Sequence, residues 1–161
     1  MEIRAKSRRL AKQYRKQGGV KLIVIDYIQL MQMPGRTENR VNELSEISRA
    51  LKHLAKEVKA PVIVLSQLNR AVEQRPKQRP QMSDLRDSGA IEQDADLIFM
   101  LYRDFVYSKN EDWKNVAEVR LVKHRNGPTK DLLLSFRDEL TRFGDLAPEV
   151  MNSYAQDRAA D

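Results

Sequence analysis

An aspartate ends a run of apolar residues near the start of the chain, where residues 22–26 read LIVID. Burying a carboxylate costs free energy unless a cation or a hydrogen-bond donor compensates it, so Asp26 needs a partner. One candidate partner is Mg²⁺, which enzymes that hydrolyse nucleoside triphosphates hold beside a strand that ends in aspartate. The alternative is a structural role, in which Asp26 caps the next helix or accepts from a backbone amide. The pattern alone leaves both open.

Three further side chains are placed to contact phosphate. Gln67 directly follows a second apolar run, and its neutral amide can both donate and accept hydrogen bonds. Lys123 and Arg125 flank His124 just before the turn residues NG. Alternate residues of a strand share a face, so Lys123 and Arg125 are expected to point the same way and can clamp a phosphate. The alternatives are a glutamine bonded to loop backbone and a charged, solvated strand edge.

A strand, helix and strand must position the first two of these residues. Residues 20–26 and 60–66 are rich in Val and Ile without polar alternation, which predicts parallel strands buried on both faces. Between them apolar residues recur every three or four positions, which predicts a helix over about 38–59 after a loop that holds Pro34 and Gly35. The unit is βαβ with a right-handed crossover, and ligands of such sheets bind at the carboxyl ends of the strands.

Other patterns complete the expected organisation. A charged helix over residues 2–17 ends at two glycines. A long basic loop follows the second strand over residues 69–83, and then a short helical segment breaks near Gly89. A third buried strand, DLIFMLY, precedes an antiparallel hairpin made of VAEVRLVKH, the turn RNGPT and KDLLLSF. The apolar periodicity stops near residue 147, so residues 148–161 are predicted to be a disordered tail.

Composition limits the class of protein. The chain has 161 residues, 41% of them apolar, which suits one domain of mixed α/β type. A net charge of +6, with basic residues bunched at 4–16, 70–79 and 120–130, is compatible with a polyanion partner or merely with a basic surface. The absence of cysteine and the presence of only two histidines argue against a zinc site. Without a signal peptide or a membrane-length apolar run, a soluble cytoplasmic protein is expected.

Five segments together resemble the carboxyl-terminal part of the DnaB-type replicative DNA helicases. They read LIVIDYIQLM, ENRVNELSEISRALKHLAKE, VIVLSQLNRAVEQR, RPQMSDLRDSGAIEQDADLIFMLYRD and VRLVKHRNGPT, and the likeness runs in order over about residues 2–147. The resemblance implies a partial RecA-like P-loop ATPase fold, with a mainly parallel sheet, an antiparallel hairpin at one margin and flanking helices. It also implies a hexameric ring that uses ATP and Mg²⁺ to move along single-stranded DNA, with primase and a helicase loader as partners.

The resemblance assigns roles at the strand ends. Asp26 matches the Walker B aspartate that holds Mg²⁺ through water, and Gln67 matches the glutamine that couples the state of the phosphates to the DNA side. Arg125 matches the arginine finger that reaches the nucleotide of the neighbouring subunit, with Lys123 as its companion. Lys130 stands where this family often has glycine.

The resemblance also assigns a DNA contact, and two of the family's ATPase motifs are missing from these residues. Arg86, Asp87 and Gly89 match the loop that lines the central channel of the ring. No G-x-x-x-x-G-K-[ST] phosphate loop occurs in the 161 residues, and the glutamate that activates water lies upstream in the family as well. The chain is therefore expected to be a truncated product, half of a split gene or an excised fragment, and to be inactive alone. The alternative function is a DNA-binding or ring-modulating remnant that has lost its ATPase.

Overall fold

A computed structural model describes residues 2–33 and 39–160, and their side chains except those of residues 86–88 and 159–160. The predicted loop at Pro34 and Gly35 lies outside the described residues. The chain divides into two compact units, the first made of Met1–Arg70 with Met82–Ala95 and the second of Ala71–Gln81 with Asp96–Asp161. Among the described residues, no helix combines the length and apolar character needed to cross a membrane.

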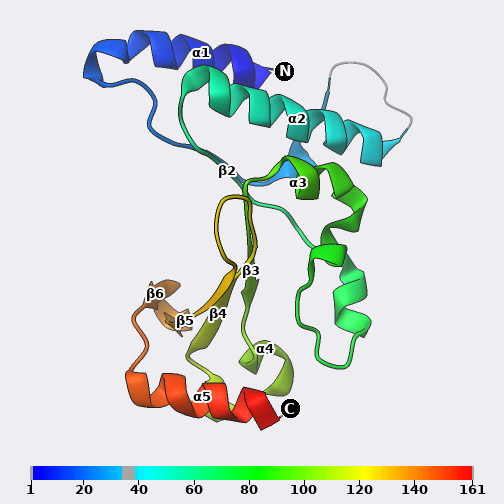
Figure 1. The fold of residues 1–161 in the computed structure, drawn as a ribbon, viewed down its shortest axis with the longest axis vertical. Helices are drawn as coiled ribbons and strands as arrows, with labels where there is room; N and C mark the ends of the chain where they lie inside the picture. Colours follow the sequence, from blue (N-terminus) through cyan, green and yellow to red (C-terminus); the bar gives the residue numbers. More distant parts are fainter. Residues whose placement is uncertain (1, 34–38, 161) are drawn as a thin grey trace. The chain divides into compact units, whose positions relative to one another are not determined.

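The first unit packs two helices on a small parallel sheet (Figure 1). Its main elements are α1 (Glu2–Gln13), β1 (Ile23–Ile25), α2 (Arg40–Val58) and β2 (Val62–Val64). Strand β1 pairs with β2 in parallel, from Ile23 opposite Val62 to Ile25 opposite Val64. The predicted βαβ unit is therefore confirmed, and its core lies between α2 and the sheet, where Ile47 and Leu54 are fully buried.

Local signals explain where the helices begin and end. The side chain of Asn39 caps α2 by accepting a hydrogen bond from the Val41 amide, at 2.9 Å. At the other end Lys59 adopts the left-handed conformation, with φ 54°. After α1 the chain makes the short turn η1 (Arg15–Gln17) and reverses at Gly18, whose φ of 90° suits glycine.

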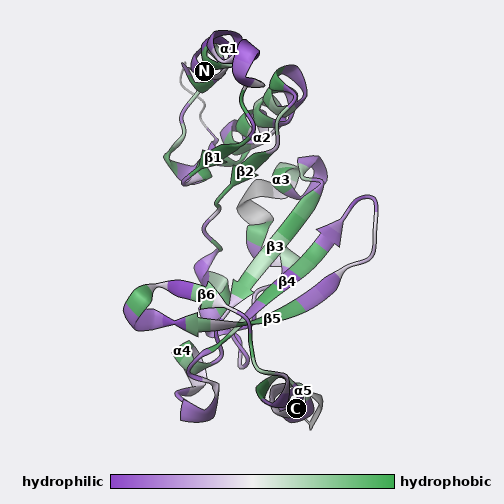
Figure 2. Cartoon of the chain, turned by 90° about the vertical axis from the view of Figure 1, so that its left-hand side faces the viewer, coloured by the Kyte–Doolittle hydropathy of each residue, from purple (hydrophilic) through white to green (hydrophobic). Residues whose placement is uncertain are grey.

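One face of the parallel sheet is apolar and exposed, although the sequence predicts burial on both faces. Helices α1 and α2 cover only the face that carries Ile25, while Val24 on the opposite face is 58% exposed and Ile63 is 51% exposed. Figure 2 shows the apolar colour along β1 and β2. The strands were correctly located from their composition, which reports that a face is apolar but does not report whether another element covers it.

Short helical elements follow each of the two parallel strands. They are η2 (Ile28–Leu30), η3 (Arg70–Gln74), η4 (Met82–Ser88) and α3 (Gly89–Asp94). The predicted helical segment with a break near Gly89 is confirmed, because η4 gives way to α3 at that residue. Helix α3 and turn η4 both pack against α2.

The second unit is built on an antiparallel sheet in the order β3–β4–β5–β6. Its strands are β3 (Leu97–Tyr102), β4 (Val116–His124), β5 (Lys130–Arg137) and β6 (Arg142–Gly144), and its turns are α4 (Phe105–Ser108), η5 (Glu111–Trp113) and η6 (Asp138–Leu140). The predicted hairpin and the α/β class are confirmed. Antiparallel pairing extends further than expected, because β3 pairs with β4 from Leu97 opposite His124 to Tyr102 opposite Glu118.

The predicted disordered tail is instead helix α5 (Pro148–Ala160), and this part of the sequence prediction is wrong. Tyr154 is the side chain that anchors the helix, since it is only 1% exposed and packs edge-on against Trp113 with ring centroids 5.0 Å apart. The indole of Trp113 also donates to Asp157, at 3.2 Å. The helix buries too narrow a stripe to produce the apolar periodicity that the sequence prediction relied on.

A charged cluster on β4 holds three segments of the second unit together. The Glu118 carboxylate, 2% exposed, accepts hydrogen bonds from the Tyr154 hydroxyl at 2.6 Å and from the Arg158 guanidinium at 2.9 Å. Arg79 pairs with its other oxygen. Burial and the adjacent carboxylate raise the pKa of Tyr154, so its hydroxyl stays protonated and donates. We call these four residues the Glu118 cluster.

Candidate functional site

The carboxyl ends of β1 and β2 are tied together, so the first candidate residues both lie at this edge of the sheet. The Leu65 amide donates to the Ile25 carbonyl at 2.9 Å, and the Ile28 amide donates back to the Leu65 carbonyl at 3.0 Å. Asp26 directly follows Ile25, and Gln67 lies two residues after Leu65. Both side chains are exposed, so this edge of the sheet offers a carboxylate and an amide to a ligand.

Gln29 is a member of this site that sequence reasoning missed. Its amide nitrogen donates to the Ser66 hydroxyl at 3.0 Å and to the Gln67 carbonyl at 3.1 Å, and its amide oxygen accepts from the Gln67 backbone at 3.2 Å. These contacts fix the backbone of Gln67 and leave its side chain exposed. The available signal was position, because Gln29 stands three residues after Asp26 in the turn η2.

The donor set at Asp26 fits Mg²⁺ held through water. Within the described residues, no three His, Cys, Asp or Glu side chains gather closely enough to hold a metal ion directly. Mg²⁺ commonly keeps several waters and takes only one or two protein carboxylates. A single exposed carboxylate beside a neutral amide and a hydroxyl meets that requirement, whereas a Ca²⁺ or Zn²⁺ cage would need more protein ligands.

The predicted DNA loop is anchored by the residues before it. Arg86 and Asp87 lie in η4, and their side chains are outside the described part of the structure. Asp84 and Leu85 are 5% and 8% exposed, and the Asp84 carbonyl accepts from the Asn69 amide at 3.0 Å. Gly89 is exposed at the start of α3, with open space where a side chain would project.

Arg125 and Lys123 belong to the second unit, at the end of β4. Lys123 lies opposite Ile98 in the ladder, and Arg125 directly follows the strand. The Arg125 guanidinium makes an ion pair with Asp96 at 3.2 Å, and its backbone amide donates to the Asp96 carbonyl at 2.9 Å. The guanidinium side chain remains 46% exposed. Asp96 therefore holds Arg125 at the strand end while leaving it accessible.

The hairpin that carries Arg125 is wider than the turn residues suggest. Pairing of β4 with β5 stops at Leu121 opposite Lys130, so eight residues lie between the last paired positions. His124 closes this connection through a 3.1 Å hydrogen bond to the Pro128 carbonyl. A side chain on Gly127 would place its Cβ 2.5 Å from the imidazole, so any larger residue here would have to displace the His124 ring.

The basic loop after β2 is bound to β4 at its far end. Arg79 pairs with Glu118, and Arg120 donates to the Pro80 carbonyl at 3.2 Å. An arginine that compensates a buried carboxylate is not available to DNA phosphates without exposing that charge. The positive charge of the loop at Arg79 therefore has a structural role.

Comparisons with known proteins agree on one family. The model of the DnaB-like helicase C terminal domain matches residues 1–145. The replicative DNA helicase DnaB of Pasteurella multocida is 53% identical over 148 residues, which is 92% of this chain and 31% of the relative. The DnaB of Geobacillus stearothermophilus is 53% identical over 146 residues, 90% of this chain and 31% of the relative. The chain thus spans about a third of the length of these relatives.

Two solved structures share the fold. One of them, an ATPase domain, matches with a TM-score of 0.82 and 45% identity, covering 90% of this chain and 50% of that one. The other is a DnaB-like replicative helicase, solved in a study of its interactions with primase, which matches with the same TM-score and identity and covers 90% and 35% of the two chains. The RecA-like α/β fold predicted from the sequence is confirmed by these neighbours.

Proposed function

Because the chain belongs to the DnaB-like helicase C terminal domain family, we propose that it supplies the later part of the motor of a hexameric replicative DNA helicase. In this proposal the ring hydrolyses ATP with Mg²⁺ to move along single-stranded DNA, and primase and a loader are its partners. The observation that carries it is the shared edge of β1 and β2, where Asp26 follows one strand and Gln29 holds the backbone of Gln67 after the other.

Each residue of the proposed site has a distinct role. Bound Mg²⁺ would neutralise charge on the phosphates, and Asp26 would hold the water shell of the ion. Gln67 would contact the terminal phosphate and, through Gln29 and Ser66, link it to the backbone after both strands. Arg125, with Lys123, would stabilise the charge that develops on the nucleotide of an adjacent subunit.

The channel contact is assigned to the η4–α3 segment. Arg86, Asp87 and Gly89 would meet the DNA backbone, and the buried side chains of Asp84 and Leu85 would hold the segment in place. A single subunit offers one such segment, so assembly into a ring would raise affinity through multivalency.

A second candidate function follows from one observation. The 161 residues contain no phosphate loop of the G-x-x-x-x-G-K-[ST] type, so the chain has little with which to cradle the phosphates of ATP. The second candidate is therefore a remnant that binds DNA or modulates a ring without hydrolysing ATP. ATP hydrolysis does not constrain the geometry of Asp26, Gln67 and Arg125 in such a remnant. A chain that contributes to ATP hydrolysis must keep that geometry.

A segment graft distinguishes the two candidates. When residues 1–145 replace the matching segment of the Geobacillus stearothermophilus relative, we expect DNA-stimulated ATP turnover within about tenfold of that of the unaltered relative. The chain by itself should show no turnover, because it lacks the phosphate loop. Turnover is measured by phosphate release and ring assembly by sedimentation. A grafted protein that forms rings without turnover would favour the remnant.

Arg86→Ala tests the channel contact in the same grafted ring. Loss of a phosphate contact should weaken binding to oligo(dT) and reduce the steepness of the plot of log affinity against log salt concentration, by at least about 0.7. The matched control is Arg142→Ala, which removes an exposed arginine from β6. Equal effects of the two variants, measured by fluorescence anisotropy at several salt concentrations, would contradict the assignment.

A further inference from the structure

The excess positive charge of the chain lies on the two helices of the first unit. Residues 2–21 contain eight Lys and Arg against one Glu, and residues 40–59 contain five against three. These two segments carry an excess of nine positive charges, while the whole chain carries six. The rest of the chain is therefore slightly acidic. Helices α1 and α2 lie side by side, which makes this layer the basic face of the first unit (Figure 1).

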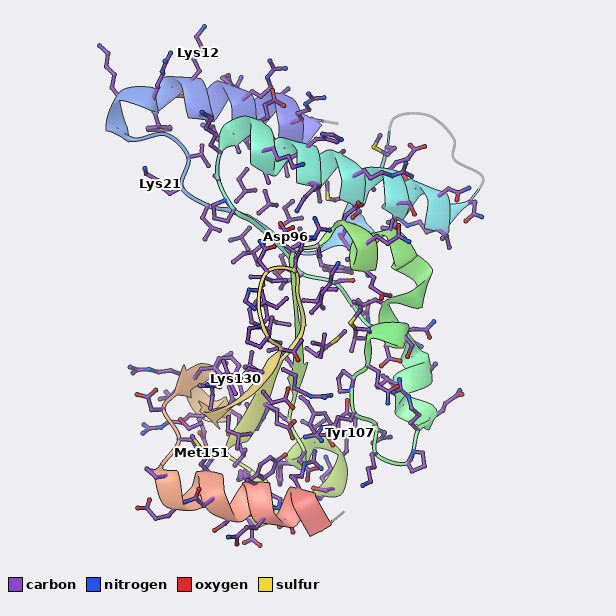
Figure 3. The ribbon with its side chains drawn as sticks, in the orientation of Figure 1. Lys12, Lys21, Asp96, Tyr107, Lys130 and Met151 are labelled. Carbon is purple, nitrogen blue, oxygen red and sulfur yellow. The ribbon has the colours of Figure 1, made fainter. Side chains whose placement is uncertain are left out.

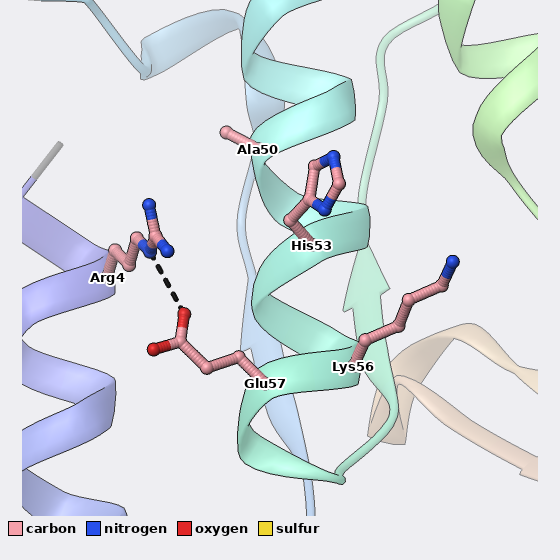
Figure 4. A pocket seen from close by; sticks show the side chains of 5 residues that line it. All are labelled: Arg4, Ala50, His53, Lys56 and Glu57. Carbon is pink, nitrogen blue, oxygen red and sulfur yellow. Dashed lines mark hydrogen bonds and ion pairs between the residues drawn. The ribbon is translucent and has the colours of Figure 1, made fainter.

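A groove runs where the ends of α1 and α2 meet. It has a volume of about 530 Å³ and is lined by four cations, one carboxylate and the glycine turn: Arg8, Arg15, Lys21, Lys59, Glu57, Gly18 and Gly19. Glu57 also lines a second hollow beside it, with Arg4, Ala50, His53 and Lys56 (Figure 4). The two hollows are adjacent and share Glu57, and we call them together the α1–α2 groove.

The single carboxylate in the groove is already shared between two arginines. Glu57 pairs with Arg4 at 3.0 Å and with Arg8 at 2.7 Å. These pairs neutralise one of the positive charges and also hold α1 against α2, which keeps the groove open in one geometry. Arg15 and Lys21 continue the groove beyond this pair, and both side chains are exposed. The groove therefore has a net positive charge that suits a chain of phosphates.

An exposed aromatic residue adjoins the groove-lining Arg15 in the chain. Tyr14 follows α1 and directly precedes Arg15, is 41% exposed and lies outside the residues that line the two hollows, and its carbonyl accepts from the Gly19 amide at 2.9 Å. Cations that follow a backbone together with an exposed aromatic ring are the features by which proteins bind single strands of nucleic acid.

We propose that the α1–α2 groove binds the sugar-phosphate backbone of a nucleic-acid strand without sequence preference, with a base stacked on Tyr14. The groove is formed by elements other than η4 and α3, so this is a second nucleic-acid contact and does not rest on the helicase role. An acidic protein segment would satisfy the cations equally well, and the exposed ring of Tyr14 favours nucleic acid over it.

The test compares two pairs of substitutions with the same chemistry. Arg15→Gln with Lys21→Gln removes two charges from the groove, whereas Arg9→Gln with Lys12→Gln removes two exposed charges of α1 that line neither hollow. Lys12 points away from α2 (Figure 3). All four side chains are exposed, so folding should be unaffected, and circular dichroism checks this.

Binding of the whole chain to fluorescent oligo(dT) is then measured by anisotropy. The groove pair should lower affinity roughly tenfold and reduce the steepness of the salt dependence by about 1.4, which is about 0.7 for each lost phosphate contact. The control pair, Arg9→Gln with Lys12→Gln, should change affinity less than about twofold. Equal losses in both pairs would show that only overall charge matters and would overturn the proposal, as would loss of binding in Arg86→Ala with no loss in the groove pair.

Two further measurements separate nucleic acid from an acidic protein. Tyr14→Leu should weaken oligo(dT) binding about fivefold or more, because stacking of a base on an aromatic ring contributes about 1–3 kcal/mol. Polyglutamate of matched charge should compete poorly with oligo(dT). Competition at equal strength, together with no effect of Tyr14→Leu, would assign the groove to an acidic protein partner and contradict the proposal.

Discussion

Arg125→Ala in the grafted ring is expected to slow ATP turnover by about 10³- to 10⁵-fold, the range typical of an arginine finger. Nucleotide binding should remain within about twofold, because the guanidinium acts mainly on charge that develops in the transition state. Arg125→Lys should recover little of the rate, since an ammonium lacks the planar, bidentate geometry of guanidinium. Turnover is measured by phosphate release, and binding is measured with a fluorescent nucleotide.

Lys130→Ala is the matched control, because this exposed cation begins the other strand of the same hairpin (Figure 3). It should leave turnover nearly unchanged. A large loss of nucleotide affinity in Arg125→Ala, or an equal loss of turnover in Lys130→Ala, would contradict the assignment of Arg125.

Mixed rings test whether Arg125 acts across a subunit interface. Subunits with Arg125→Ala are combined with subunits that carry Asp26→Asn, under conditions where exchange of subunits is verified. Wherever an intact Asp26 faces an intact Arg125, a complete site should form and turnover should exceed the sum of the two parents. No gain, in rings whose isolated sites can turn over, would show that Arg125 does not serve its neighbour.

Glu118→Gln should destabilise the second unit by about 3 kcal/mol, at the low end of the range for breaking a buried ion pair. The amide has no charge to compensate Arg158 and Arg79, whose side chains are 16% and 31% exposed. Partial solvation of Arg79 is the reason for the low end of the range. Trp113 is the only tryptophan and packs on Tyr154, so its fluorescence during urea unfolding reports on this cluster.

Glu111→Gln provides the control for this measurement. Its side chain is 74% exposed, and its pair with Lys114 is 3.9 Å long, so the expected change in unfolding free energy is below about 0.5 kcal/mol. If the two variants unfold at the same urea concentration, the Glu118 cluster does not stabilise this unit. A change in the slope of the transition without a change in its midpoint would point to the unfolded state instead.

Elements with a strong local signal were predictable from the sequence. The helix predicted over about 38–59 is α2, the strand VAEVRLVKH is β4, and the glycines after α1 do reverse the chain. Elements that depend on contacts between residues distant in sequence were not predictable from local patterns. Helix α5 shows this, because a few anchoring contacts, chiefly from Tyr154 and Arg158, hold it rather than a continuous apolar stripe.

The sequence predicted which residues lie at the strand ends of the candidate site. It did not predict the hydrogen bonds and ion pairs that connect them. Asp26 and Gln67 follow β1 and β2 as expected, because strand composition located both strands. The link between them through Gln29, and the ion pair of Arg125 with Asp96, depend on side-chain geometry that a single sequence does not encode in any short motif. The resemblance to a family supplied roles for the predicted residues but did not reveal these two partners.

Both faces of strand β3 are apolar, so hydrophobicity alone does not determine which face is buried. Ile98, Met100 and Tyr102 are buried, yet Leu97, Phe99 and Leu101 on the other side are just as apolar and are 46–63% exposed. A slip by one residue would exchange the two sets at little hydrophobic cost.

Polar contacts at the two ends of β3 exclude this competing arrangement. The Asp96 carbonyl accepts from Arg125 before the strand, and the Tyr102 hydroxyl donates to Asp104 at 3.1 Å and to the Lys77 carbonyl at 3.3 Å after it. The fidelity of folding here depends on a few polar anchors rather than on the core. Loss of the Tyr102 hydroxyl would therefore favour the slipped register, and not merely lower the stability of the native one.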